Sequence, residues 1–395
     1  MAWACYALAG PMSSSTPIDA FACAALFAKG KTQLEIARAL NLSQSNVSRL
    51  LRDVQEYIRV ERAFEWDWLD PSTRDKVRRR ISPRELADRL AAFAALHRQP
   101  APEVHVVPVA ESDDKGAKFE SFAQPAAQVL RELLERVLGR VGVAWGSTIW
   151  HTAQALRSTA ARPFRDQQPI EFIPLCGDPL IDSRNDYADR TSSRIVSELS
   201  RTVNGDKTRP AWLGLVPAFI PRRFDKKKIR VIDELIDLVP QYGRIFGPRQ
   251  SPPTEPPLAA DLHMIVTAAG PSNRPLGFGG NPLLYLSESE AAILAESIYG
   301  DIGGVLLPRP EKIAEAGPGR SLVEELTTRW TGLKLKHLRD CSQRAFAEPG
   351  ASRPGVTLLS FGTDHVDVVL QAVREGLVNH LIVGSDLEPA LTREL

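Results

Sequence analysis

The sequence is poor in cysteine, with only Cys5, Cys23, Cys176 and Cys341 among its 395 residues. They lie far apart, and no two have the short spacing of a zinc site or of a small disulfide framework. The simplest interpretation is a reduced, cytoplasmic protein with incidental thiols. We predict neither a bound metal nor a cofactor.

An excess of one charge is also missing, because 49 basic residues face 48 acidic ones and the formal net charge is +1. Any nucleic-acid binding must therefore come from a local group of residues and not from bulk charge. The apolar fraction of 43% is ordinary for a globular protein with a sizeable core. The length predicts two domains or more.

Long apolar runs are absent as well. No stretch approaches the roughly 20 residues that a membrane-spanning helix needs. The apolar N-terminal segment lacks the basic residues that begin a secretory signal peptide, and three serines follow it at positions 13–15. We expect a disordered leader over residues 1–15 and no membrane association.

Residues 18–58 carry the pattern of a helix-turn-helix. A first helix is predicted over residues 18–28. Thr32 then stands three residues before Glu35, which is the spacing of a capping box, and starts a second short helix that ends at Leu40. Two short helices joined by a tight turn are the arrangement that places a helix in the major groove of DNA.

The third helix is predicted over residues 44–57, with Ser43 as its N-cap. Its apolar residues recur at helical spacing and predict a face against the first two helices. An alternating run over residues 58–64 is consistent with the strand of a wing. The polar residues that we expect to contact DNA are Thr32, Gln44, Ser45, Asn46, Ser48, Arg49 and Arg52. The alternative is a small helical bundle that merely packs on something else.

A linker and a helix are predicted over residues 66–100. The linker contains the basic run Arg74, Lys76, Arg78, Arg79 and Arg80, followed by an amphipathic helix over residues 83–96. The basic run is either a contact to DNA phosphates or an ordinary solvated face. The helix serves either dimer contacts or packing on the next domain.

Residues 101–395 read as an α/β domain, because short apolar runs alternate with helical segments. This pattern favours a largely parallel sheet that is covered on both faces. The predicted strands are residues 104–109, 141–144, 171–175, 212–216, 262–267, 357–360 and 381–383. A helix is predicted over residues 126–138.

Five stretches resemble a known family, in the family's order along the chain. They are residues 32–40, 43–51, 141–148, 299–304 and 372–383. The family is that of SorC-type bacterial transcriptional regulators, which are sugar-binding and DeoR-like. The resemblance implies a winged helix-turn-helix followed by an effector domain related to sugar-phosphate isomerases and deaminases. It also implies binding of a metabolite, often a phosphorylated sugar, that changes how an oligomer sits on its operator.

Ligands of an open parallel sheet bind at the carboxyl ends of its strands. Gly146, Ser147 and Thr148 lie at such a strand–helix junction and offer backbone N–H groups and hydroxyls to a phosphate or carboxylate. The alternative role of the two hydroxyls is N-capping. The remaining candidate ligand residues, each with an equally plausible structural role, are Gly177, Asp178, Gly270, Asp301 and His365.

One departure from the family pattern concerns charge. Family members commonly carry a lysine where this chain has Asp364 and His365, and the aspartate that usually follows the last strand is displaced to Asp386. A carboxylate near the ligand opposes phosphate binding, whereas a protonated histidine partly compensates. This charge weakens the interpretation that the effector is a phosphorylated sugar. It favours an unphosphorylated polyol, a sugar acid or no ligand.

We accordingly predict a regulator that is not an enzyme, with double-stranded operator DNA and a small carbohydrate-derived effector as partners. Homo-oligomerisation is expected because operators are symmetric. The alternative is an isomerase- or deaminase-like enzyme fused to a DNA-binding head.

Overall fold

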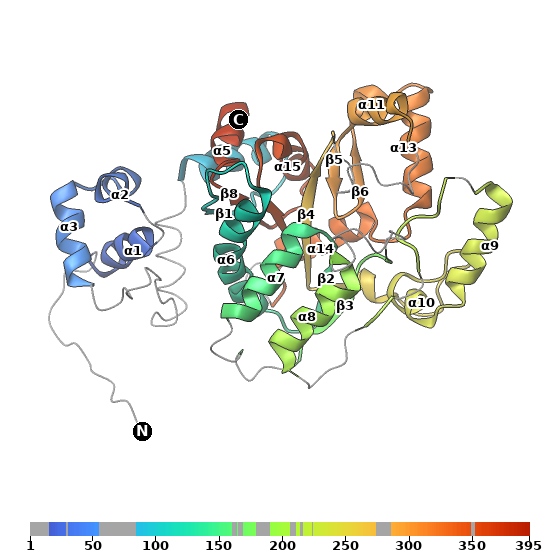
Figure 1. Ribbon diagram of the computed structural model, residues 1–395, viewed down its shortest axis with the longest axis horizontal. Coiled ribbons are helices and arrows are strands. Elements are labelled where there is room, and N and C mark those ends of the chain that lie inside the picture. The colour runs from blue at the N-terminus through green and yellow to red at the C-terminus, as the bar shows by residue number, and fades with distance from the viewer. Residues whose placement is uncertain are drawn as a thin grey trace. The chain divides into compact units, whose positions relative to one another are not determined.

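The computed structural model describes residues 16–28, 31–54, 84–159, 164, 169–178, 190–205, 211–213, 216–222, 224–273, 286–348 and 352–395. The chain forms two compact units, Met1–Ala87 and Asp88–Leu395 (Figure 1). The predicted leader, wing and basic run lie outside the described residues. The predicted domain limits at residues 65 and 100 stay predictions.

The N-terminal unit contains helices α1 (Thr16–Ala28), α2 (Gln33–Leu40) and α3 (Gln44–Asp53). Thr32 and Ser43 are the N-caps of α2 and α3, as predicted, and α3 is shorter than predicted because Val54 is its C-cap. The three helices bury a shared apolar core. Its members at the α2–α3 contact are Ile36, Leu40, Val47 and Leu50.

The C-terminal unit is built on a sheet whose strands follow the order β1-β8-β7-β4-β2-β3, and every neighbouring pair on this path is parallel. The largely parallel sheet predicted from the sequence is therefore confirmed. The strands on this path are β1 (Glu103–Val107), β2 (Arg140–Val143), β3 (Glu171–Pro174), β4 (Met264–Pro271), β7 (Gly355–Ser360) and β8 (His380–Gly384).

A hairpin extends the sheet beyond the parallel strands. Strand β5 (Ile298–Ile302) pairs antiparallel with the end of β4, and β6 (Val305–Pro308) pairs antiparallel with β5. The sequence analysis predicted no strands here. The turn residues are Gly303 and Gly304, both at positive φ, and a Cβ on Gly304 would lie 2.2 Å from the Trp330 ring.

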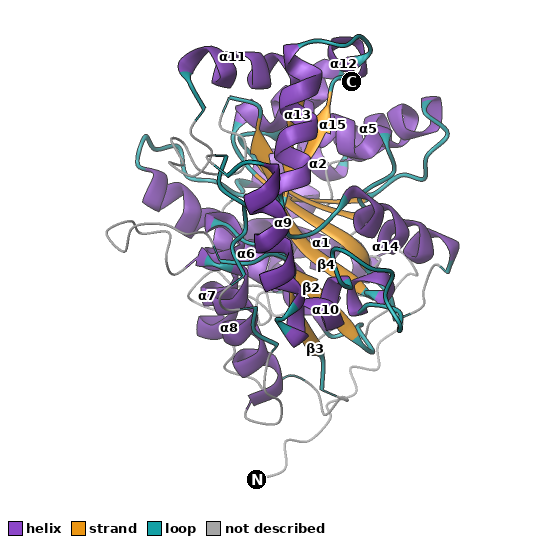
Figure 2. Cartoon of the chain, turned by 90° about the vertical axis from the view of Figure 1, so that its right-hand side faces the viewer, coloured by secondary structure: helices purple, strands orange, loops and turns teal. Residues whose placement is uncertain are grey.

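Helices cover both faces of the sheet, with α6, α7 and α8 on one face and α14 on the other (Figure 2). The helices of this part of the chain are α5 (Arg84–Leu96), α6 (Lys115–Leu134), α7 (Ser147–Thr159), α8 (Ser192–Asn204), α9 (Lys226–Asp237), α10 (Pro240–Phe246), α11 (Glu288–Ser297), α12 (Pro310–Ile313), α13 (Pro318–Arg329), α14 (Leu335–Ala347), α15 (Val366–Arg374) and α16 (Glu388–Glu394). No helix in the described part of the chain combines the length and apolarity that crossing a membrane requires.

Two predicted elements differ from the structure. The predicted helix over residues 126–138 begins much earlier, because the Asp114 carboxylate caps α6 by accepting hydrogen bonds from the N–H groups of Gly116 and Ala117. The predicted strand over residues 212–216 is wrong in its described residues. There, Trp212 is 64% exposed, and the pairing nearby is a single bridge between Asp178 and Pro217.

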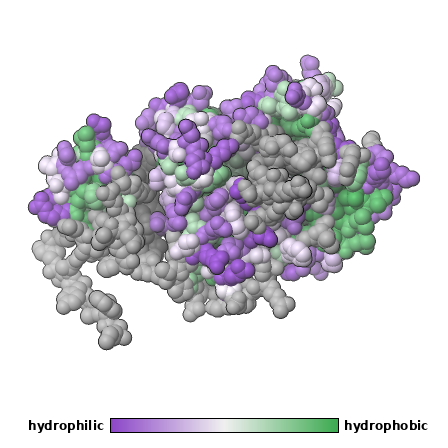
Figure 3. All heavy atoms as spheres, viewed as in Figure 1, coloured by the Kyte–Doolittle hydropathy of each residue, from purple (hydrophilic) through white to green (hydrophobic). Residues whose placement is uncertain are grey.

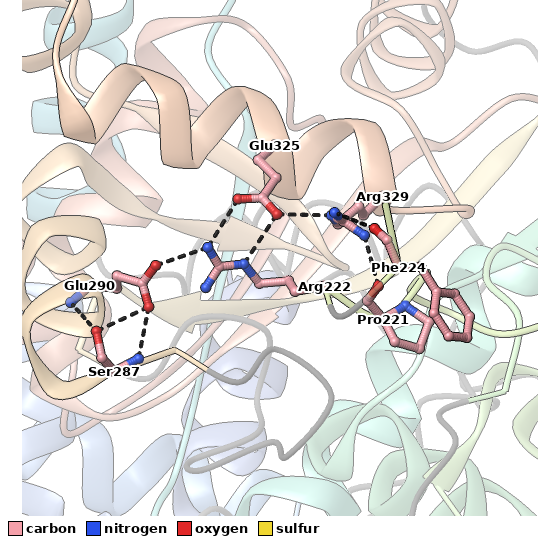
Figure 4. Close-up of polar contacts among 7 residues, drawn as sticks. All are labelled: Pro221, Arg222, Phe224, Ser287, Glu290, Glu325 and Arg329. Carbon is pink, nitrogen blue, oxygen red and sulfur yellow. Dashed lines mark hydrogen bonds and ion pairs between the residues drawn. The ribbon is translucent and has the colours of Figure 1, made fainter. Parts of the chain in front are cut away.

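A polar network joins Pro221, Arg222 and Phe224 to α11 and α13 (Figure 4). The Arg222 guanidinium is 19% exposed and binds Glu290 of α11 at 2.8 Å and Glu325 of α13 at 3.0 Å. Arg329 also binds Glu325 and donates to the carbonyl of Pro221 at 2.7 Å. The bond from Arg222 lowers the pKa of the Glu290 carboxyl to about 2.

We predict that Arg222→Met destabilises the protein by about 2 kcal/mol, because it leaves two partly buried carboxylates without their shared cation. Arg320→Met is the matched control, since Arg320 pairs with Glu324 on the outside of the same helix α13 and is 48% exposed. Its cost is expected to stay below about 1 kcal/mol. Urea unfolding followed by circular dichroism measures both, and equal losses would contradict the prediction.

Candidate functional site: a nucleic-acid interface and a ligand pocket

The turn between α2 and α3 is held by local hydrogen bonds. Asn41 ends α2 in the left-handed region at φ 52°, and the Leu42 N–H donates to the Ala37 carbonyl at 2.9 Å. The Ser43 hydroxyl then caps α3 by accepting from the Asn46 N–H at 3.2 Å. This geometry fixes the direction in which α3 leaves the turn.

The residues predicted to contact DNA lie mostly on the outer face of α3. Arg49 and Arg52 are exposed, and so are Gln44 and Ser45, whereas Asn46 and Ser48 are half-buried. The Arg49 guanidinium donates to the Asn46 side-chain carbonyl at 2.8 Å. Such a pair presents a planar donor group beside an amide, and these are the groups that read guanine and adenine edges.

Thr32 has a different role from the α3 residues. Its hydroxyl accepts from the Glu35 N–H at 3.3 Å, and the Thr32 N–H donates to the Glu35 carboxylate at 2.7 Å, which completes the capping box. Thr32 remains exposed at the start of α2. A contact from Thr32 to DNA stays a prediction.

The C-terminal unit contains a cavity of about 760 Å³ at the carboxyl ends of β2, β4, β7 and β8. The chain runs outward in opposite directions from β2 and β4, which makes their carboxyl ends a topological switch point. The volume falls in the range of small-molecule sites. The cavity therefore lies where the sheet topology favours ligand binding.

Most of the predicted ligand residues meet in this cavity. Those that line it are Gly146, Ser147, Thr148, Gly270, Asp301 and His365. Gly146 lies at φ 121°, and α7 begins at the next residue, so first-turn N–H groups of α7 point toward the cavity. Gly270 is needed for close packing, because a Cβ there would lie 2.3 Å from the Asp301 carboxylate.

Gly177 and Asp178 are not among the described residues that line the cavity. They follow β3, the edge strand next to β2, and their backbone is used elsewhere. The Asp178 N–H donates to the Val216 carbonyl, and the Asp178 main-chain carbonyl accepts from the Ala218 N–H, each at 2.9 Å. Burial raises the pKa of the Asp178 carboxyl, although a hydrogen bond from Thr191 lowers it. Asp178 thus belongs to a local bridge with Pro217, and a Cβ on Gly177 would lie 2.1 Å from the Val216 carbonyl.

One side of the cavity is cationic. Lys115 and Lys118 come from the first turn of α6, and Arg190 precedes α8. The Arg190 guanidinium donates to the Ser147 hydroxyl at 2.7 Å, and its carbonyl accepts from the Gly146 N–H at 3.2 Å. A guanidinium beside a helix N-terminus is a strong site for an anion.

The other side is acidic and rich in hydroxyl-binding groups. Asp301 is 3% exposed and accepts from the Gly304 N–H at 2.9 Å, so it also holds the hairpin turn. Asp386 accepts from the Gly362 N–H at 3.0 Å through one carboxylate oxygen. Its other oxygen and the Ser360 hydroxyl are buried and have no hydrogen-bond partner within the described residues. Asp386 and Ser360 both belong to the lining of the cavity.

Asp364 and His365 form the rim of the acidic side. The His365 ring nitrogen Nδ1 lies 3.2 Å from Asp364 and 3.3 Å from the Gly362 carbonyl. The Asp364 side chain is 45% exposed, so solvent screens its charge. The aspartate that is displaced in sequence, Asp386, nevertheless lines the cavity.

Among the lining residues that the sequence reasoning missed are the cationic and titratable side chains of Lys115, Lys118, His151 and Arg190. His151 stacks on Phe119 with ring centroids 5.0 Å apart, and it also faces the cavity. Burial, followed by the nearby Arg190, lowers its pKa. The only available sequence signal was the helix start at Asp114, which places the two lysines one turn apart.

No family model matches the chain, and no curated protein matches it. Solved structures do. The full-length sorbitol operon regulator SorC from Klebsiella pneumoniae is 16% identical, with a TM-score of 0.52, over 96% of this chain and 100% of that one. A domain of a possible sugar-binding transcriptional regulator from Arthrobacter aurescens TC1 is 18% identical, with a TM-score of 0.51, over 78% of this chain and 97% of that one.

A DeoR family transcriptional regulator from Listeria monocytogenes is similar in the same way, with 17% identity and a TM-score of 0.50 over 78% of this chain and 98% of that one. At these identities the likeness establishes the fold. It confirms the resemblance that the sequence motifs predicted and the fold class that followed from it.

We expect the cavity to bind an anion through Arg190. Inorganic phosphate should raise the melting temperature of the full chain, and Arg190→Met should weaken phosphate binding about ten-fold or more, because a charge-assisted hydrogen bond is lost. Arg157→Met is the matched control, since Arg157 lies on α7 but binds Glu198 away from the cavity lining. Equal affinities of the Arg190 and Arg157 variants would refute the anion site.

Proposed function

We propose that this protein is a transcriptional regulator that reads operator DNA with α3 and binds a sugar-derived effector in its C-terminal unit. The observation that carries the proposal is the cavity at the carboxyl ends of the parallel strands, in a chain that also contains a helix-turn-helix. The similar structures support it, because they are described as a sorbitol operon regulator and a possible sugar-binding regulator. A protein that reads operator DNA works in the cytoplasm.

The effector that fits the cavity is an anionic sugar derivative. Its phosphate or carboxylate would lie against Arg190 and Ser147, and its hydroxyls against Asp386 and Ser360. The family lysine is missing near Asp364, but Lys115, Lys118 and Arg190 bring cations to the cavity from other elements. These cations offset the charge argument against a phosphorylated effector.

The regulatory step would be a population shift. The effector must bind two arrangements of the regulator with different affinities, and the favoured arrangement then fits the operator better or worse. Proton transfer is not required for this role. The isomerase-like alternative would instead consume the ligand, so recovery of the effector unchanged after prolonged incubation distinguishes the two functions.

Self-association would use an exposed apolar stripe on α9. The stripe consists of Val231, Leu235 and Leu238, which are 49%, 54% and 77% exposed and recur at helical spacing. Figure 3 shows apolar side chains gathered on the right-hand side of the view, where Figure 1 places α9. An apolar stripe of this kind is typical of an interaction surface.

The charges that flank the stripe favour a second copy of the same chain as its partner. The first half of α9 carries Lys227, Lys228 and Arg230, and the second half carries Glu234 and Asp237. Two such helices packed antiparallel across a two-fold axis bring basic halves against acidic halves. A symmetric dimer has this isologous kind of contact.

The test of the DNA-reading role starts with selection of a preferred duplex from random sequences by the full chain. Arg49→Ala should cost about 1–3 kcal/mol of discrimination between the selected and a scrambled duplex, because a base contact is lost. Arg38→Ala removes the same charge from the exposed face of α2 and should lower the affinity for both duplexes by the same factor. Fluorescence anisotropy at fixed salt measures the ratio. Unchanged discrimination by the Arg49 variant would remove α3 from the reading role.

The same duplex tests the effector. A panel of sugar phosphates, sugar acids and neutral sugars should contain an anionic member that changes the affinity of the wild-type chain for the selected duplex. Arg190→Met should abolish this response and leave operator binding intact. A normal response in the Arg190 variant would place the effector elsewhere.

We predict that Leu235→Glu converts the full chain from an oligomer to a smaller species, because it buries a charge in the contact. Leu138→Glu is the control, since Leu138 is 57% exposed but stands outside the α9 stripe. Sedimentation equilibrium at micromolar concentration measures the mass. A wild-type monomer, or a Leu235 variant with the wild-type mass, would exclude α9 as the dimer surface.

A further inference from the structure

Two histidines and a glutamate lie together near the amino ends of β1 and β8. The cavity lies at the opposite, carboxyl ends of the strands. Glu103 begins β1 and His105 lies two residues later, on the same face of that strand. His380 begins β8 and is the register partner of Glu103. The imidazole side chains are 9% and 8% exposed, whereas the Glu103 side chain is 49% exposed.

The carboxylate of Glu103 lies between the two rings. One oxygen is 3.4 Å from Nε2 of His105 and the other is 3.5 Å from Nδ1 of His380, and the three ligand atoms all lie within 4.8 Å of one another. Both distances exceed the usual 2.7–3.2 Å of an N–H···O hydrogen bond. The rings themselves are nearly parallel, with centroids 6.0 Å apart.

The two distances from the Glu103 oxygens to the ring nitrogens are close to the spacing of ligands around one metal ion, whereas the spread of up to 4.8 Å among the three ligand atoms requires them to draw together when the ion binds. Two ligands bound to zinc at about 2.0–2.1 Å lie roughly 3.3 Å apart when the arrangement is tetrahedral. Two imidazole nitrogens and one carboxylate oxygen form a ligand set that zinc uses, with water in the fourth position. The solvent-exposed side of Glu103 provides the route for that water and for the ion.

The backbone holds the three side chains in place. The Glu103 N–H donates to the Asn379 carbonyl at 2.8 Å, so β1 is fixed to the residue before His380. The Asn379 side chain is 6% exposed, accepts from the Val356 N–H at 2.8 Å and donates to the Ser342 carbonyl at 3.1 Å. A ligand set on two hydrogen-bonded strands needs little ordering when the ion binds.

We propose that Glu103, His105 and His380 bind a divalent transition-metal ion of the zinc type. The ion links the first strand of the C-terminal unit to the last one. It therefore closes a long loop of the chain and stabilises the folded unit by mass action. This site is separate from the effector cavity, and its existence does not depend on the proposed regulatory function.

The opposite edge strand supplies a matched comparison. Glu171 begins β3 as Glu103 begins β1, and its side chain is 39% exposed. Its neighbours are Arg140 at 2.9 Å and Arg244 at 3.2 Å, which offer no metal ligand. Glu171→Gln therefore tests whether any carboxylate at a strand start affects metal binding.

The experiment uses the full-length chain after removal of metals with a chelator. Titration calorimetry with Zn²⁺, and visible absorption with Co²⁺, should show one ion per chain in a tetrahedral environment, and Zn²⁺ should raise the melting temperature. Glu103→Gln keeps the size of the side chain and removes its charge. It should weaken binding at least about ten-fold, as should His380→Gln.

The control variant Glu171→Gln should bind the ion like the wild type. Circular dichroism verifies that each variant is folded, and the half-exposed position of Glu103 keeps that variant informative if His380→Gln fails to fold. The proposal is overturned by a wild-type chain that binds no Zn²⁺ in competition with a weak chelator. It is equally overturned by unchanged affinity in Glu103→Gln.

Discussion

Parallel pairing is the constraint from which the rest of the C-terminal unit follows. Because β2, β4, β7 and β8 run in one direction, the segments that leave them all emerge at the same edge of the sheet. Residues as distant in sequence as Ser147 and Asp386 therefore line one cavity. For the same reason the amino ends of β1 and β8 lie together at the opposite end of the strands, where Glu103 pairs with His380. Strand β8 thus contributes to a cluster of polar residues at each of its ends.

Within the cavity, the position of charge matters more than its total. Arg190 is tied to Ser147 at the start of α7, whereas Asp386 is tied to the Gly362 backbone after β7. Each charged group is thereby held in place at the cavity lining. A ligand with one anionic end and several hydroxyls is complementary to this division. A neutral or a purely anionic molecule would leave one side unmatched, which costs binding energy.

Local signals in the sequence were sufficient for the starts of α2 and α3 and for the six parallel strands, but not for the β5–β6 hairpin. The capping box at Thr32 and the N-cap at Ser43 act over three residues, so their spacing alone predicts where α2 and α3 begin. The Gly146–Thr148 junction was predictable because a helix follows directly after a strand. Arg190 was not predictable, since it reaches Ser147 only through tertiary packing. The same is true of His105 and His380, whose pairing depends on the order of the strands and not on any motif.

The failure of Gly177 and Asp178 to reach the cavity follows from the same reasoning. They follow a strand just as Gly146 does, but β3 is an edge strand, and its carboxyl end packs against Val216 and not against the switch point. Arg190 follows β3 in the sequence and, unlike Gly177 and Asp178, lines the cavity. It immediately precedes Thr191, the N-cap of α8, and its carbonyl accepts from Gly146 at the start of α7. An anion that binds Arg190 therefore acts on the first turns of two helices at once, and this is the part of the structure through which effector binding would be coupled to the rest of the unit.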